Sequence, residues 1–97
     1  MRPISIKIQL KGFLARIVDE QEIELDVPAG SSVAGLITKL AIQSGTELKK
    51  VILDRDGSVY KGIAVSVNQE VIPYQRLAEI QIAEGSTVAL IPLAAGG

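Results

Sequence analysis

The chain closes with the sequence Val88-Ala89-Leu90-Ile91-Pro92-Leu93-Ala94-Ala95-Gly96-Gly97, and the rest of the fold can be built outward from it. Residues 88–92 are an apolar run that follows a Glu-Gly-Ser turn, a combination typical of a strand. Residues 93–97 carry only one large side chain. We therefore expect a domain over residues 1–92 whose last strand delivers an extended tail, 93–97, with the α-carboxylate of Gly97 as its distinctive chemical group.

The chain contains no cysteine and no histidine. This composition excludes thiol nucleophiles, imidazole bases, disulfides, iron–sulfur clusters and zinc sites built from Cys and His. We expect no metal site, so any chemistry falls to carboxylates, amines, hydroxyls or the end of the chain.

Length and charge narrow the class of protein further. The 97 residues, 47% of them hydrophobic, suffice for one domain with its own core. Ten basic and 11 acidic residues give a net charge of -1 without any block of like charge, and the chain has few aromatic residues, so nucleic acid is not an expected partner. No apolar run approaches the about 18 residues of a membrane span, and no signal peptide is evident, so we expect a cytoplasmic protein without a membrane partner.

The N-terminal part of the chain predicts a hairpin. Apolar and polar residues alternate over 4–10 and again over 22–27, which is the pattern of half-buried strands. The segment between them, 13–18, is expected either to extend the first strand or to form the turn. The apolar faces of the two strands would then lie on the same side.

After Pro28 the spacing of apolar residues changes to that of a helix. Apolar residues at 33, 36, 37 and 40 form one stripe. Ser31 or Ser32 can cap the first amides, and Gly45 suits the left-handed residue that ends a helix. Gly35, in the first turn, is expected to reflect close packing of the helix on the sheet.

The remaining elements complete a two-layer α+β domain. The apolar run 51–53 leads into the turn Asp54-Arg55-Asp56-Gly57, for which we prefer a solvated turn to a calcium loop because the required distal Glu is missing. Alternation predicts a strand over 63–67, and a turn at 69–70 leads to 71–72. The order β-β-α-β-β favours a mixed sheet in which the last strand lies beside the first.

Two segments resemble a known family, the ubiquitin-like sulfur carriers, typified by the small subunit of molybdopterin synthase and the thiamin sulfur carrier. The sequence Val65-Ser66-Val67-Asn68-Gln69-Glu70 is similar to the family turn V-x-V-N-G-E, and residues 84–97 are similar to its ending D-G-D-E-V-A-x-x-P-P-V-A-G-G. Gln69 replaces the turn glycine, and Leu93 replaces a second proline. The resemblance implies a β-grasp fold, with a mixed sheet of four to five strands on one main helix.

The same resemblance implies a function for the tail. A ubiquitin-activating-type adenylyltransferase would consume ATP to adenylate Gly97, and sulfur transfer would then produce a thiocarboxylate. Gly96 would let the backbone enter a narrow channel. The protein would thus be a carrier and not an enzyme, with no bound cofactor, and its leading partner would be the large subunit of molybdopterin synthase in a heterotetramer.

The resemblance also suggests a surface for binding partners, on the exposed side of the sheet beside the tail. Its positions here are Val71, Ile91, Pro92, Leu93, Ala94 and Ala95. Burial in the core is the simpler interpretation of Val71 and Ile91, but since Leu90 and Ile91 are adjacent on a strand, only one of them can face the helix. Lys11 stands where the family has an aromatic residue.

Several functions stay open at this point. Within sulfur chemistry, the chain could serve thiamin or cysteine synthesis or modify other proteins. From a different class, it could be a ubiquitin-like binding module that works through its sheet and never uses its terminus.

Overall fold

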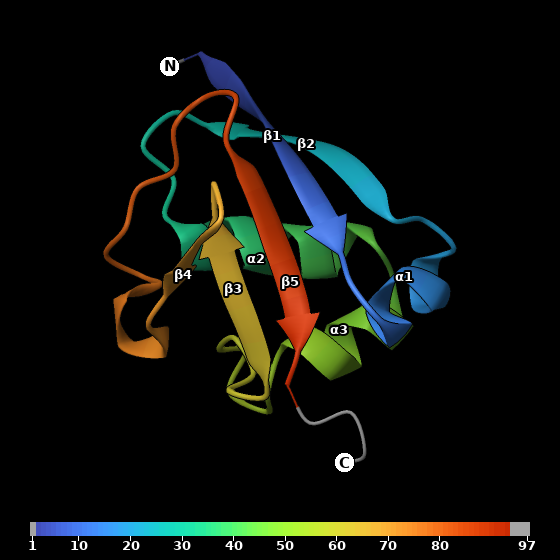
Figure 1. Cartoon of the computed structure of the whole chain (residues 1–97). Coiled ribbons are helices and arrows are strands. Elements are labelled where there is room, and N and C mark those ends of the chain that lie inside the picture. Colours follow the sequence, from blue (N-terminus) through green and yellow to red (C-terminus); the bar gives the residue numbers. More distant parts are fainter. Residues whose placement is uncertain (1, 94–97) are drawn as a thin grey trace.

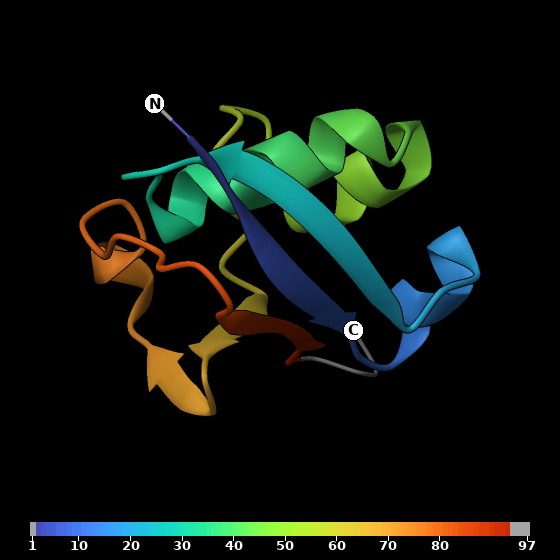
Figure 2. The same ribbon diagram turned by 90° about the horizontal axis from the view of Figure 1, so that it is seen from above.

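The computed structural model describes residues 2–93, which form a mixed sheet with helices packed on one face (Figure 1). Figure 2 shows helices α2 and α3 together on one side of that sheet. In chain order the elements are β1 (Pro3–Leu10), α1 (Phe13–Val18), β2 (Glu22–Pro28), α2 (Val33–Gln43), α3 (Thr46–Ile52), β3 (Ile63–Val67), β4 (Glu70–Ile72), the 3-10 turn η1 (Tyr74–Arg76) and β5 (Thr87–Pro92). The expected α+β class with one main helix, α2, is confirmed.

The sheet has the order β2-β1-β5-β3-β4. β1 is antiparallel to β2 and parallel to β5, while β3 is antiparallel to both β5 and β4. The last strand therefore lies beside the first, as predicted, and occupies the centre of the sheet. A central strand is bonded on both sides, so its end is held firmly in place.

Helix α2 covers the sheet with the predicted apolar stripe. Its buried residues pack with the inward side chains of the strands in one core; those of the helix are Val33, Leu36, Ile37, Leu40 and Ala41. Ser32 is the N-cap, because its Oγ accepts a hydrogen bond of 3.0 Å from the amide of Gly35. Gly45 follows the C-cap with a φ of 99°, which favours glycine.

The interpretation of Gly35 was wrong. This residue is exposed, and a Cβ placed on it would meet only the Oγ of Ser32, at 3.3 Å, with no atom of the sheet within contact distance. The glycine therefore lies beside the cap and away from the sheet.

Two short helices differ from the expectations for their segments. Residues 13–18 form α1 and neither extend β1 nor make a simple turn; only Leu14 is fully buried. Val51 and Ile52 end α3, in which Leu48 and Ile52 are buried. Each helix has one or two buried apolar residues, which is too few to establish a helical period in the sequence.

Residues Asp54–Gly57 form a solvated turn, as expected. The Oδ1 of Asp54 accepts hydrogen bonds from the amides of Asp56 and Ser58, at 2.9 and 3.1 Å, so the carboxylate is used in local backbone bonding. Over residues 2–93 no group of three His, Cys, Asp or Glu side chains is placed to hold a metal ion. Among the described helices none has the length and hydropathy needed to cross a membrane.

Candidate functional site at the end of the last strand

Strand β5 carries the chain to the edge of the domain and fixes it up to Leu93. The amide of Leu93 donates a hydrogen bond of 2.9 Å to the carbonyl of Gly62, and Pro92 is in register with Ile63 of β3. The Leu93 side chain is 62% exposed. The predicted tail residues Ala94, Ala95, Gly96 and Gly97 lie outside the described residues.

Helix α1 supports the other side of the same strand end. The amide of Lys11 donates to the carbonyl of Leu90 at 3.1 Å, and the chain then turns at Gly12, with a φ of 57° and a ψ of -138°. A Cβ on Gly12 would lie 3.2 Å from the Cγ of Pro92. Gly12 is therefore required both by its backbone conformation and by its close approach to Pro92.

A second glycine lies beneath an aromatic ring at the opposite side of the strand end. A Cβ on Gly62 would come within 2.3 Å of the Cε2 of Tyr60, so this ring lies directly over the glycine. Because the Gly62 carbonyl accepts the Leu93 amide, Gly62 contacts both the Tyr60 ring and the end of the part of the chain that the structure describes. Gly12, Tyr60 and Gly62 were not among the residues expected at this site, since only the folded chain brings them to the end of β5.

The sheet face without helices carries two of the predicted partner positions. Leu90 is fully buried against the helices, while Ile91 is partly exposed on the other face, as strand alternation requires. Val71 is 65% exposed, which rules out the alternative that it is a core residue. Ser66 pairs with both Val71 and Ala89, and because Ser66 and Ala89 are small, this face has a hollow next to Val71.

Pro92 differs from the expectation for its position. Strand alternation places it opposite to Ile91, where it approaches Gly12 at the start of α1. The structure thus brings Val71 and Ile91 to one face of the sheet, while Pro92 supports the strand end. Lys11 is exposed beside that end, and its backbone bonds β5.

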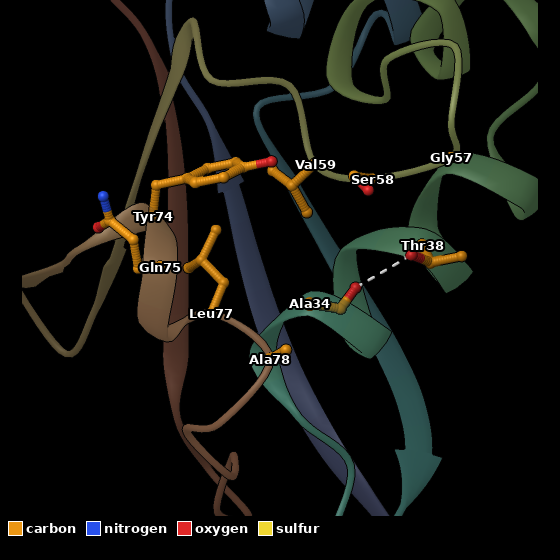
Figure 3. Close-up of a pocket in the computed structure, with 9 residues that line it drawn as sticks. All are labelled: Ala34, Thr38, Gly57, Ser58, Val59, Tyr74, Gln75, Leu77 and Ala78. Carbon is orange, nitrogen blue, oxygen red and sulfur yellow. Dashed lines mark hydrogen bonds between the residues drawn. The ribbon is translucent and has the colours of Figure 1, made fainter.

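A separate hollow lies on the helix side of the sheet, between α2, the 57–59 loop and η1 (Figure 3). None of its lining residues is charged: they are Ala34, Thr38, Gly57, Ser58, Val59, Tyr74, Gln75, Leu77 and Ala78. The Thr38 hydroxyl donates to the carbonyl of Ala34 at 3.1 Å, so its proton is already used. The hollow therefore offers neither a nucleophile with a base nor a site for a charged ligand.

Comparisons of this sequence with known proteins identify its family. Residues 8–97 match the ThiS family. A candidate sulfur carrier protein of Archaeoglobus fulgidus is 30% identical over 97% of this chain and 100% of its own length.

Solved structures show the same fold. SAMP1 of Haloferax volcanii, a small archaeal modifier protein, has a TM-score of 0.82 and 26% identity over 96% of this chain and 99% of its own. A candidate molybdopterin converting factor subunit 1 of Pyrococcus furiosus has a TM-score of 0.71 and 18% identity over 92% and 97% of the two chains. The protein described here belongs to the ThiS family of ubiquitin-like sulfur carriers and modifiers and has their β-grasp fold.

Proposed function

We propose that this protein carries sulfur as a thiocarboxylate on Gly97. The observation that carries the proposal is the strand end: β5 is bonded through Leu93, which is itself exposed, and the small residues of the tail follow immediately in the sequence. An extended segment of five residues reaches about 17 Å, enough to enter an active site buried in another protein.

The chemistry requires a partner enzyme at each step. A carboxylate is a poor electrophile, so an adenylyltransferase would join the Gly97 carboxylate to the AMP part of ATP, releasing pyrophosphate. Hydrosulfide then attacks the acyl carbon and AMP leaves with the bonding oxygen, so that a C–S bond replaces the C–O bond to AMP and the thiocarboxylate forms without a change of oxidation state. Glycine at position 97 leaves the reacting carbonyl without a neighbouring side chain. This protein is the co-substrate, it binds no cofactor of its own, and both partners work in the cytoplasm.

The leading acceptor pathway is molybdenum cofactor synthesis, with the protein as the small subunit of molybdopterin synthase in a heterotetramer. The fold likeness to the converting factor of Pyrococcus furiosus supports this assignment. Val71 and Ile91 supply an apolar surface on the open sheet face, next to the strand that delivers the tail. Exposed apolar side chains beside a reactive terminus suit a transient interface with the large subunit.

A second candidate is modification of other proteins, in which the activated Gly97 carbonyl would form an amide with a lysine. The likeness to SAMP1 of Haloferax volcanii favours it. Both candidates begin with the same adenylate and differ in the nucleophile that attacks it. Thiamin and cysteine synthesis would share the thiocarboxylate and differ only in its acceptor.

Intact-mass spectrometry tests the carrier function directly. The protein is incubated with ATP, sulfide and its cognate adenylyltransferase, which has been shown to be competent. The expected product has one oxygen of the Gly97 carboxylate replaced by sulfur, and a variant lacking Gly97 stays unchanged. No mass change in the full chain would overturn the proposal. Lysine side chains joined to the Gly97 carbonyl, found after trypsin digestion as branched peptides that carry residues 77–97, would identify the modifier function instead.

A further inference from the structure

Strand β2 forms one edge of the sheet, and its outward backbone groups can be identified from the register. Leu10 donates its amide to the carbonyl of Gln21 at 2.8 Å, and Ala29 donates to that of Arg2 at 3.2 Å. Since bonded and non-bonded pairs alternate along an antiparallel ladder, Ile23, Leu25 and Val27 bond β1. The backbone groups of Glu22, Glu24 and Asp26 therefore point away from the sheet.

Most of this edge is available to another strand. Within residues 2–93 no strand pairs with the outer side of β2, and one of its outward carbonyls, that of Asp26, accepts a hydrogen bond from the Nζ of Lys39 on α2. The amides and carbonyls of Glu22 and Glu24 lie beyond the reach of that bond. Such unpaired groups are a template for an added strand.

A hollow runs beside the same edge, between β2 and the C-terminal part of α2. It is lined by four apolar residues, Val18, Ile23, Leu25 and Leu40, together with Glu20, Glu24, Gln43 and Ser44. Side chains on the helix face of an added strand would lie beside Ile23 and Leu25, directly over this hollow. Apolar side chains are therefore expected at every second position of such a strand, where they would contact Ile23 and Leu25.

The opposite face of the edge is acidic. Glu22, Glu24 and Asp26 alternate with the core residues and are exposed, and no described salt bridge uses their carboxylates. The nearby cations are Lys7, which is opposite Glu24 in register, and Lys39. Acidic residues thus outnumber basic ones, and side chains of an added strand on this face would be favoured if they were positively charged.

We propose that the β2 edge binds an extended segment of a partner protein in which basic and apolar residues alternate. The backbone of that segment would pair with Glu22 and Glu24, its apolar side chains would enter the hollow, and its basic side chains would lie beside the carboxylates. A second copy of this chain is a poor occupant, because pairing β2 with β2 would place like charges opposite one another. This binding does not depend on Gly97.

Nuclear magnetic resonance titration of the full chain tests the proposal. The probe is a short peptide that alternates lysine and isoleucine, and saturable shifts are expected at 22–26 and 40–44. A fully N-methylated peptide of the same sequence keeps the charges and side chains but has no backbone donors, and it should not bind. Shifts centred on Val71 and Ile91, equal binding of the N-methylated peptide, or no saturable shift would each overturn the proposal.

Charge variants supply a matched comparison. Glu22→Gln with Glu24→Gln should weaken binding of the alternating peptide by about fivefold or more, since rim charges of this kind contribute to affinity. Glu47→Gln with Glu84→Gln changes the net charge equally at exposed positions elsewhere and should leave the dissociation constant unchanged. Equal weakening by both pairs would show general charge attraction and overturn the assignment. Broadening at 22–26 that grows with protein concentration in the absence of peptide would identify a second copy as the occupant.

Discussion

The amide of Leu93 is bonded to the carbonyl of Gly62 at 2.9 Å, and the Tyr60 ring lies over that same glycine. Leu93, the final residue that the structure describes, is therefore bonded to a residue with no side chain, which is covered by an aromatic ring. On the other side of the strand, Pro92 approaches Gly12. The end of β5 is thus held between two glycines that belong to different parts of the chain.

Removing Gly97 should abolish thiocarboxylate formation and leave the fold intact. The core residues all lie between Ile6 and Leu90, so we expect the free energy of unfolding to change by less than about 0.5 kcal/mol. Thermal denaturation and intact-mass spectrometry measure the two effects. A variant that still accepts sulfur would show that the terminus is not the site of loading.

Gly62→Ala should displace the Tyr60 ring beside the strand end. The added Cβ would force the ring to move, and because Tyr60 is 49% exposed and has room to do so, we expect a stability loss of about 0.5 kcal/mol. In a Tyr60→Ala background the same substitution should cost much less, because the clash is gone. Equal losses in both backgrounds, measured as a double-mutant cycle, would show that the ring is not responsible.

Gly12→Ala should destabilise the protein more than the same substitution at a glycine whose surroundings leave room for a side chain. Both its backbone conformation and its contact with Pro92 oppose a side chain, for a total of about 1–3 kcal/mol. Gly30→Ala is the control, because Gly30 has a φ of 90° but no atom within 4 Å of the added Cβ. Denaturant unfolding should rank Gly12→Ala as the costlier change, and the reverse order would contradict packing of α1 against the strand end.

Gln69→Gly should stabilise the protein. Gln69 has a φ of 75° in the turn between β3 and β4, a conformation that costs a residue with a side chain about 1–2 kcal/mol. Gln43→Gly, at the end of α2, should lower stability by about 0.5–1 kcal/mol because glycine is a poor helix former. A fall in the unfolding midpoint of Gln69→Gly would mean that the glutamine side chain makes a compensating contribution.

Val71→Glu should weaken binding to the adenylyltransferase or to the synthase large subunit. A charge on the open sheet face would have to be desolvated at the interface, which we expect to cost about 1–2 kcal/mol of affinity. Ile42→Glu is a matched control, because Ile42 is 67% exposed against 65% for Val71 but lies on α2. Calorimetric titration should detect a loss only for Val71→Glu; equal losses would place the interface elsewhere.

Much of the fold could be predicted from local patterns. The alternation in β1, β2 and β3, the apolar stripe of α2 and a serine cap at 31 or 32 each depend on neighbouring residues only. Each was found where expected, with Ser32 as the cap. Helices α1 and α3 were not predicted, because six and seven residues hold too few buried positions to show a period. Gly35 was misinterpreted for a related reason. A glycine has no side chain, so the sequence does not show which neighbouring residue requires it to be small.

The sequence alone determined that this chain has no thiol or imidazole group, that a strand leads into a diglycine ending, and that the order of elements suits a β-grasp sheet. The tertiary structure decided which side of the sheet Val71, Ile91 and Pro92 occupy, and that Gly12 and Gly62 meet the end of β5 from opposite sides. The physical reason is distance along the chain. Alternation and helical spacing are local properties, whereas a contact between residues 12 and 92 exists only after β5 has paired with both β1 and β3.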